Sequence, residues 1–207
     1  SFTIATTSSV ALDAKIIGFS FAVTEGEASF IPFNDNQDDA TNVLASVRNI
    51  LQDATVSKIS FNLKYIILVL RNYDIHVRGK LFDVMLAHYV IQPEQKHMLV
   101  SMADSYLHAD AINIEPYFSG KEKSTWNMSL LPPKVCSDYT SQRADFCLSL
   151  KTLLTDELNK NNEYQLFEDI EMPLMPVLAD MERNGVVIDT KVLNDISILF
   201  NERLKYY

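Results

Sequence analysis

The order of strand-like and helix-like patterns limits the fold of this chain most strongly. Residues 2–6, 16–24 and 28–33 read as three strands, and short turns join them. A further strand pattern at 56–61 stands among several helix-like segments. Strands first, followed by one strand among many helices, predict an α/β domain in which a mixed sheet packs between helices.

Apolar residues at helical spacing and suitable cap residues predict the helices. Asp39 is a good N-cap for a helix whose apolar positions run to Leu51. Asp83 stands at the start of another helix, and Pro133 occupies the permissive first turn of a long one. Helical patterns cover residues 62–73, 83–91, 99–107 and 133–159. Residues 109–130 show no regular pattern and are expected to be irregular.

The charge balance narrows the possible functions. The 207 residues carry a net charge of −9 with a pI near 4.9, which does not suit a module that holds nucleic acid by electrostatics alone. A nuclease remains compatible, because its own site can be a carboxylate cluster that binds metal first. Lys121, Lys123 and Trp126 form a local basic cluster that reads as a solvated loop rather than a phosphate clamp. We expect DNA contacts of this domain to be weak or absent.

Cysteine and histidine positions favour a reducing compartment and no zinc site. Cys136 and Cys147 fall in one predicted helix, and eleven residues separate them by about 16 Å, too far for a disulfide. We therefore expect a cytoplasmic protein. No Cys or His spacing suggests zinc. We expect the four histidines to be structural or on the surface, and they are His76, His88, His97 and His108.

Hydrophobic runs are too short for a membrane span, and the end of the chain reads as the start of another domain. No apolar run reaches the roughly 18 residues that a membrane helix needs, so no membrane partner is expected. The chain begins within a strand pattern, which favours a piece of a longer protein. Two helices flank "NGVVID", where Asn184-Gly185 is a stop signal and Asp189 a cap. We expect two domains, 1–163 and 164–207, the second truncated.

Four segments, in order and with matching spacing, resemble family A DNA polymerases of the bacterial DNA polymerase I type. They are "IIGFSFAVTEGEASFIPF" (16–33), "FNLKYIILVLRNYDIHVRGKLFDVMLAHYVI" (61–91), "DYTSQRADFCLSL" (138–150) and "EMPLMPVLADMERNGVVID" (171–189). The first three resemble the 3′→5′ exonuclease domain, and the last resembles the passage into the polymerase thumb. The resemblance implies a ribonuclease-H-like (DnaQ-like exonuclease) fold, with a mixed five-stranded sheet flanked by helices and followed by C-terminal helices of a second domain.

The family's exonuclease chemistry depends on four carboxylates that hold two divalent cations about 4 Å apart. They are an Asp-x-Glu pair on the first strand, the Asp that ends Asn-Leu-Lys-Tyr-Asp, and an Asp four residues after a Tyr. Residue by residue, the resemblance places these positions on Ala5, Thr7, Ile66 and Arg143. None of these side chains is a strong Mg²⁺ ligand, so the sequence predicts no metal site and no intact catalytic residue.

Several family residues remain, and we read them as scaffold. The second motif keeps Asn62, Lys64 and Tyr65, and the third keeps Tyr139, which in active relatives helps to position the attacking water. With no metal to bind, Tyr139 is expected to pack only. Two carboxylates match positions that are not metal ligands in the family: Asp83 is expected to cap a helix and Asp145 to pair with a nearby base such as Arg143.

The leading hypothesis is therefore an exonuclease-like domain that has lost its metal ligands and supports the polymerase domain of the same chain. The first alternative is an active metal-dependent exonuclease with relocated ligands at Asp13, Asp83, Asp138 and Asp145. The second is binding of DNA or a protein without catalysis. The hydroxyl run at 6–9 predicts no phosphate cradle, because such a cradle needs glycines and exposed backbone N–H groups.

The resemblance also implies the activity of the parent protein. That protein would be a DNA-directed DNA polymerase that uses deoxynucleoside triphosphates and Mg²⁺, acting in DNA replication and repair. No palm or fingers motif occurs in these residues, so the fragment itself is expected to need no cofactor and not to polymerise. A monomer is expected, with DNA bound mainly through the rest of the parent.

Overall fold

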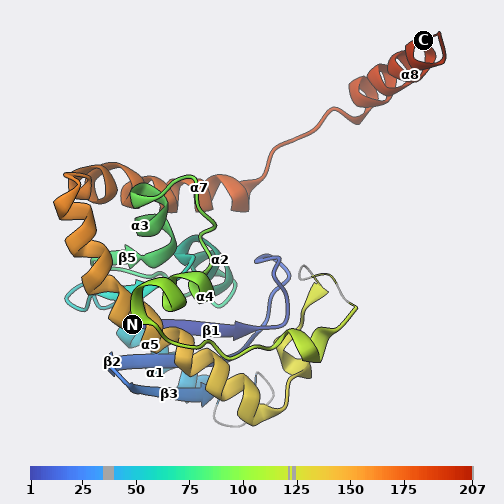
Figure 1. Cartoon of the computed structure of the whole chain (residues 1–207). Helices are drawn as coiled ribbons and strands as arrows, with labels where there is room; N and C mark the ends of the chain where they lie inside the picture. Colours follow the sequence, from blue (N-terminus) through green and yellow to red (C-terminus); the bar gives the residue numbers. More distant parts are fainter. Residues whose placement is uncertain (35–39, 121, 123–124, 207) are drawn as a thin grey trace.

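The computed structural model describes residues 1–34, 40–120, 122 and 125–206 (Figure 1). The predicted cap Asp39 and the predicted loop lysines Lys121 and Lys123 lie outside these ranges. In chain order the elements are β1 (Phe2–Thr6), β2 (Ile16–Thr24), β3 (Glu27–Pro32), α1 (Ala40–Gln52), β4 (Lys58–Ser60), α2 (Leu63–Arg71), β5 (Leu81–Asp83), α3 (Val84–Ile91), α4 (Leu99–Met102), the π-helix η1 (Ala103–Leu107), the 3-10 helices η2 (Glu115–Phe118) and η4 (Met128–Leu130), α5 (Pro133–Lys160), α6 (Tyr164–Leu166), the π-helix η5 (Phe167–Glu171), α7 (Met172–Asn184) and α8 (Thr190–Tyr206).

The first three strands form an antiparallel meander in the order β1-β2-β3. Ile4 pairs with Phe19, and Phe19 pairs with Ile31. All five residues of β1 are buried, which means that this strand is covered on both faces. Predicted strands 2–6 and 16–24 are confirmed, and the third begins one residue earlier than predicted.

The other two strands, β4 and β5, are parallel, and Ile59 pairs with Phe82. Side chains join this pair to the meander: the Ser60 hydroxyl donates to the carbonyl of Phe2 at 2.6 Å. The expected five strands are therefore present, but within the described residues they form a three-stranded and a two-stranded sheet rather than one continuous ladder. The fifth strand has three residues, too few for a hydrophobic pattern to reveal it.

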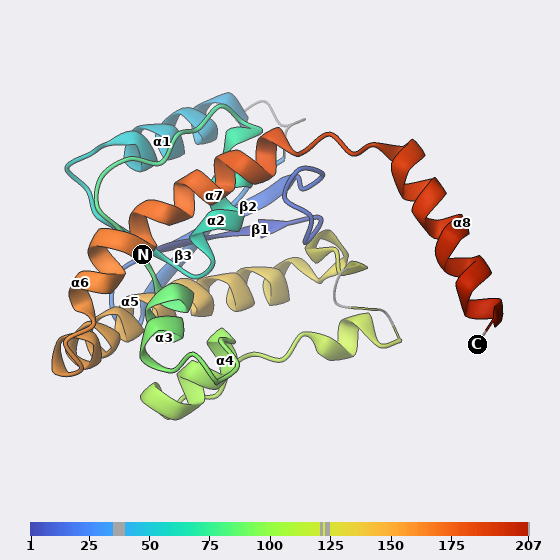
Figure 2. The same ribbon diagram turned by 90° about the horizontal axis from the view of Figure 1, so that it is seen from above.

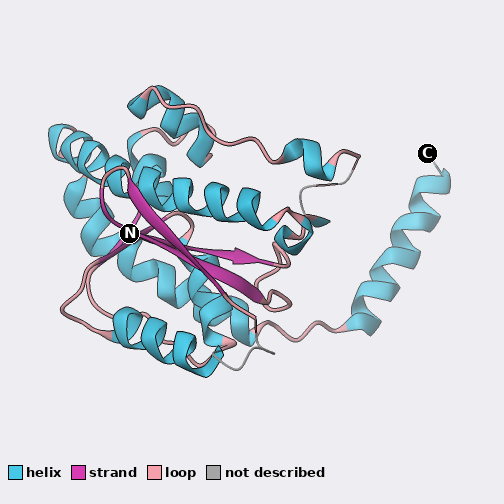
Figure 3. Cartoon of the chain, turned by 90° about the horizontal axis from the view of Figure 1, so that it is seen from below, coloured by secondary structure: helices cyan, strands magenta, loops and turns pink. Residues whose placement is uncertain are grey.

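The long helix α5 covers one face of the meander and makes most of its contacts with β2, β3 and β1. Helix α1 lies on the opposite face, as Figures 2 and 3 show. The predicted helix from Pro133 is confirmed, and both cysteines on it are buried and unpaired. The predicted helix at 99–107 is present as α4 followed by the π-helical turn η1.

Asp83 joins the two strands of the smaller sheet to two helices, and its predicted role as a helix cap is confirmed. Its carboxylate accepts the N–H groups of Met85 and Leu86 at the start of α3, at 2.9 and 3.4 Å. It also accepts the N–H groups of Asn62 and Leu63 at the start of α2, at 3.1 and 2.7 Å. Complete burial raises the pKa of this carboxyl to about 6, although the four hydrogen bonds favour the charged form.

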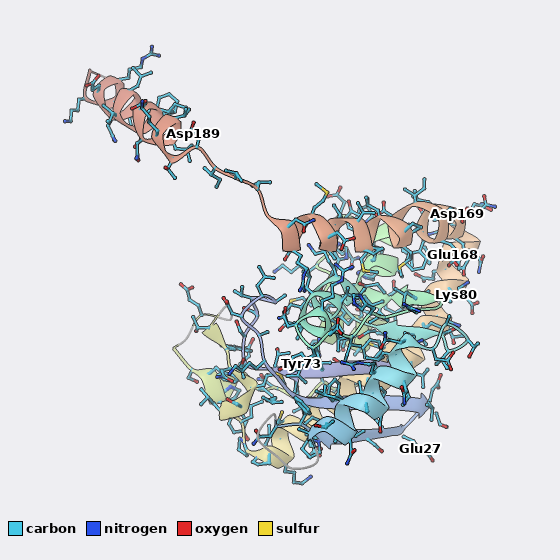
Figure 4. All side chains as sticks on the ribbon, turned by 180° about the vertical axis from the view of Figure 1, so that it is seen from behind. Glu27, Tyr73, Lys80, Glu168, Asp169 and Asp189 are labelled. Atoms are coloured by element: carbon cyan, nitrogen blue, oxygen red, sulfur yellow. The ribbon has the colours of Figure 1, made fainter. Side chains whose placement is uncertain are left out.

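Residues after the predicted boundary at 163/164 still belong to the main core. Phe167 packs against Phe82 with ring centroids 5.0 Å apart, and Met175 and Ala179 are buried in the same cluster. An ion pair at the surface joins this segment to the loop before β5: the Lys80 Nζ lies 2.9 Å from a carboxylate oxygen of Glu168 (Figure 4). Helix α7 also pairs with α2, through Lys64–Glu182 at 2.8 Å and Arg71–Asp180.

Helix α7 ends where the sequence predicts, because Gly185 adopts a positive φ of 66°. An extended segment comes next, and α8 lies away from the body of the structure (Figures 1 and 2). Asp189 caps α8 as predicted and accepts the N–H groups of Lys191 and Val192 at 3.0 and 3.1 Å. Among the described residues, no helix is long and apolar enough to cross a membrane.

Replacing Asp83 by Asn should destabilise the protein by about 1–3 kcal/mol, because the Asn Nδ2 would face the Leu63 N–H and leave that buried donor unpaired. Urea unfolding followed by circular dichroism measures the change. Asp156→Asn, on the exposed face of α5, is the matched control and should shift the midpoint little. Equal midpoints for the two variants would contradict the role assigned to Asp83.

Candidate functional site

Most of the motif residues meet at a cavity of about 270 Å³, here called the motif cavity. It is bounded by β1 and the loop after it, by the start of α2 and by α5. Its lining residues are Thr3, Ile4, Thr6, Ser8, Ser9, Phe61, Asn62, Tyr65, Ile66, Ile114, Trp126, Met128, Tyr139 and Arg143. The second and third motifs, far apart in sequence, are therefore brought together by the fold.

The structure brings the predicted positions together only in part. Ile66 and Arg143 line the motif cavity. Ala5 is fully buried in a small core cluster against which Tyr139 packs. Thr7 lines a different cavity, and its hydroxyl oxygen accepts the N–H of Lys15 at 3.0 Å.

Thr3, which the sequence interpretation did not include, lines the motif cavity instead. Residues 3 and 5 share one face of β1, whereas Phe2 and Ile4 join the main core on the other face. The pairing of β1 with β2 skips Ile17 after Ala5, so the extra residue lies in β2, and β1 itself ends at Thr6. Thr7 therefore lies in the loop after β1, where the alternation of the strand's side chains no longer applies. The alternation of side chains along β1, which puts Thr3 on the same face as Ala5, is the signal that could have identified Thr3.

Arg143 is the one charged side chain that lines the motif cavity, as far as the described residues extend. Its guanidinium lies over the rings of Phe61 and Tyr139, 5.3 and 5.4 Å from their centroids, and donates to the Tyr139 hydroxyl at 3.4 Å. The expected pairing with Asp145 is wrong. Asp145 accepts the N–H of Gly26 at 2.7 Å, because residues two apart on a helix point in different directions.

The retained residues of the second motif have structural partners. The Tyr65 hydroxyl bonds the Thr6 hydroxyl at 2.7 Å and donates to the carbonyl of Ser8, which fixes the loop after β1 to α2. Burial raises the pKa of Tyr65, so it stays a neutral phenol at physiological pH. Asn62, with a left-handed φ of 58°, caps α2 through its Oδ1, and Lys64 points to α7.

None of the four proposed relocated ligands lines the motif cavity. Asp83 is occupied by four backbone N–H groups, and Asp145 by one. Asp138 pairs with Lys134 at 2.7 Å on the exposed surface of α5. Within the described ranges, no three His, Cys, Asp or Glu side chains are grouped so that they could hold a metal ion.

A second cavity of about 650 Å³, here called the adjoining cavity, lies beside the first. The two share Phe61, Ile114, Trp126, Tyr139 and Arg143. His97 lines the adjoining cavity, and its Nδ1 lies 2.8 Å from Nδ1 of the buried His88. One of these two nitrogens must carry a proton and the other must accept it. This pairing agrees with the expectation that His88 and His97 are structural.

The fold and the convergence of these motifs define a ribonuclease-H-like exonuclease domain. A family model described as "DNA polymerase I, ribonuclease H-like domain" matches residues 2–124. The chain belongs to this family, as the resemblance implied.

Bacterial DNA polymerases I are similar to the chain over most of its length. The enzyme of Pseudomonas aeruginosa is 34% identical over 209 residues, covering 96% of this chain and 23% of the relative. That of Bacillus subtilis is 30% identical over 197 residues, covering 94% and 21%. The chain thus spans less than a quarter of the length of these curated relatives.

Solved structures share the fold at lower sequence identity. The POL domain of Pol1 from M. smegmatis, in complex with DNA primer-template and dNTP, has a TM-score of 0.76 at 22% identity, covering 99% of this chain and 32% of that one. Brucella melitensis NrnC has a TM-score of 0.71 at 14% identity, covering 89% and 84%. At these identities the likeness supports the fold alone.

The histidine pair should make stability depend on pH. Burial, and then the neighbouring His97, lower the pKa of His88, while Glu157 opposes the shift. The folded state therefore prefers neutral His88, and this contribution to stability is present above about pH 6.5 and falls as the pH drops below it. Thermal unfolding at pH 7.5 and 5.0 should show a smaller loss of stability at the lower pH in His88→Asn than in wild type.

His108→Asn is the control for this comparison, because His108 is exposed and left-handed, a conformation that Asn tolerates. It should follow wild type at both pH values. Asp83 has the opposite sign, since its raised pKa favours the folded state as the pH falls through 6, but it is unchanged in all three proteins. An equal pH response of His88→Asn and wild type would contradict the assignment.

Proposed function

We propose that this domain is the 3′→5′ exonuclease-like part of a DNA polymerase I, that it has lost metal-dependent hydrolysis, and that it supports the polymerase part of the same chain. The observation that carries the proposal is the lining of the motif cavity. Where the family holds two metal ions, this chain presents hydroxyls, an amide, apolar groups and one cation.

This set of donors does not fit a pair of Mg²⁺ ions. Such ions need several carboxylate or carbonyl oxygens with negative charge, and an Ile and an Arg stand at two of the four positions. At an effective dielectric constant of 20, two unit charges 4 Å apart interact by about 4 kcal/mol, so the guanidinium would repel each divalent ion by about twice that. We therefore derive no hydrolytic step for this site.

The strand positions of the lost Asp-x-Glu pair are better assigned to Thr3 and Ala5 than to Ala5 and Thr7. Thr3 lines the motif cavity with Ile66 and Arg143, and Ala5 lies on the same face of β1, next to Tyr139. Thr7 lies in the loop after the end of β1 and lines another cavity. Neither assignment restores a carboxylate.

The supporting role is argued from the C-terminal helices. Helix α7 is fixed to the body through the buried Met175 and Ala179 and through the ion pairs with α2, so it can hold the polymerase part in a defined orientation. Helix α8 exposes apolar side chains that need a partner, namely Val192, Leu193, Ile196, Ile198, Leu199, Phe200 and Leu204. We propose that the polymerase part covers them, and that the domain division lies at Gly185 rather than at 163/164.

The activity of the whole protein is inferred from the relatives and remains part of the proposal. Its polymerase part would use Mg²⁺, deoxynucleoside triphosphates and DNA, and the whole protein would be a monomer. The alternative of an active exonuclease with relocated ligands is not adopted, because its four candidate carboxylates are spread over the structure and outside the motif cavity.

The purified chain should release no nucleotide from single-stranded DNA in Mn²⁺ or Mg²⁺ above the rate measured with EDTA. A 5′-labelled oligonucleotide resolved on a sequencing gel measures the release, and an active DNA polymerase I exonuclease serves as the positive control. EDTA-sensitive shortening from the 3′ end would contradict the proposal and favour relocated ligands.

Restoring carboxylates should distinguish the two strand assignments. The variant Thr3→Asp/Ala5→Glu/Ile66→Asp/Arg143→Asp should bind Mn²⁺, measured by loss of the free-ion electron paramagnetic resonance signal. The variant Ala5→Asp/Thr7→Glu/Ile66→Asp/Arg143→Asp carries the same charges and should bind at least about tenfold more weakly, because Thr7 is outside the cavity. Circular dichroism checks that both fold, and equal affinities would contradict the Thr3 assignment.

A further inference from the structure

We infer that the motif cavity is an anion site that binds the phosphate of a small phosphomonoester through Arg143, without a divalent metal. The inference rests on the proposed function only for the position of the cavity. Its chemistry comes from the side chains present there.

The charge in the motif cavity itself favours an anion, whereas the adjoining cavity is lined by an exposed carboxylate, Glu115. Arg143 is its one charged lining residue within the described chain. Among the described residues, no carboxylate oxygen lies within 4.0 Å of the Arg143 guanidinium, the distance limit for a salt bridge. The guanidinium makes a long bond to the Tyr139 hydroxyl, and two aromatic rings hold its plane. A half-buried guanidinium without a counter-ion attracts an anion more strongly than one on the open surface.

The neighbouring polar groups are arranged to donate. Asn62 lines the motif cavity and uses its Oδ1 for the cap of α2, so its amide can contribute only the Nδ2 hydrogens, as donors, to a ligand. The Tyr139 hydroxyl accepts from Arg143 and can donate its own proton onward. Thr6 and Tyr65 are instead bonded to each other and to Ser8, so the hydroxyl run itself does not form the site.

The adjoining cavity indicates what the phosphate is attached to. It shares the wall of Phe61, Ile114, Trp126, Tyr139 and Arg143, and it is more than twice as large, about 650 against 270 Å³. An apolar or aromatic group on the phosphate can lie there while the phosphate contacts Arg143. A phosphomonoester fits better than a carboxylate, because its three oxygens can meet several donors and it carries close to two charges above about pH 6.

The chain carries its own probe for this test, because Trp126 is its single tryptophan and lines both cavities. The protein is titrated in EDTA and low salt with phenyl phosphate, with inorganic phosphate and with benzoate, and Trp126 fluorescence is followed with excitation at 295 nm. We expect saturable binding of phenyl phosphate, weaker binding of inorganic phosphate, and little response to benzoate. Binding of phenyl phosphate should weaken at pH 5.5 and in high salt.

Three variants assign the effect to Arg143. Arg143→Met should raise the Kd for phenyl phosphate at least about tenfold, and Arg143→Lys should lose less because it keeps the charge. Arg78→Met removes an exposed arginine and should bind as wild type does. Circular dichroism checks each fold, and the Lys variant serves if the Met variant unfolds.

The outcomes are distinct for this inference and for the proposed function. The anion site would be overturned if no saturable signal appeared up to about 50 mM phenyl phosphate, since a weaker Kd would mean no specific binding. It would also be overturned by equal Kd values for Arg143→Met and Arg78→Met, by benzoate binding as tightly as phenyl phosphate, or by a requirement for a divalent metal. Nucleotide release in Mn²⁺ would overturn the proposed loss of hydrolysis while leaving binding in EDTA to be judged on its own.

Discussion

The buried carboxylate of Asp83 is the interaction on which the geometry of the site depends most. It ends β5, receives the first N–H groups of α3, and reaches the first N–H groups of α2 in the other motif segment. Two helix starts are thus fixed to one strand end. Because Asn62, Tyr65 and Ile66 all lie on the first turns of α2, their positions at the motif cavity depend on this one contact.

The rest of the motif cavity is held by contacts that need no metal. The Tyr65 hydroxyl donates to the loop after β1, and Tyr139 packs against the cluster around Ala5. The Arg143 guanidinium lies over the rings of Phe61 and Tyr139. Neutral side chains and one cation make these contacts, so the shape of the motif cavity does not depend on a bound metal ion.

Much of the fold could be predicted from the sequence, and the failures have local physical causes. The meander, α2, α3 and α5 were predictable from periodicity and caps, since those signals are properties of neighbouring residues. The strand Leu81–Asp83 was too short to show a pattern, and the separation of the two sheets depends on side-chain bonds such as that of Ser60. The placement of Asp145 failed because its partner, Gly26, is 119 residues away.

The sequence by itself determined the family, the end of α7 and the start of α8, because residue identity and local capping suffice for these. It also predicts, through the resemblance, that no carboxylate stands at the motif positions. Only the tertiary structure decided which residues share the cavity, that the core extends to Ala179, and that Arg143 has no carboxylate partner among the described residues. These depend on where β1 ends and on packing between elements that are far apart in the sequence. Once the chain leaves β1 at Thr6, the alternation of side chains no longer places Thr7, and contacts between residues far apart in the sequence leave no local pattern.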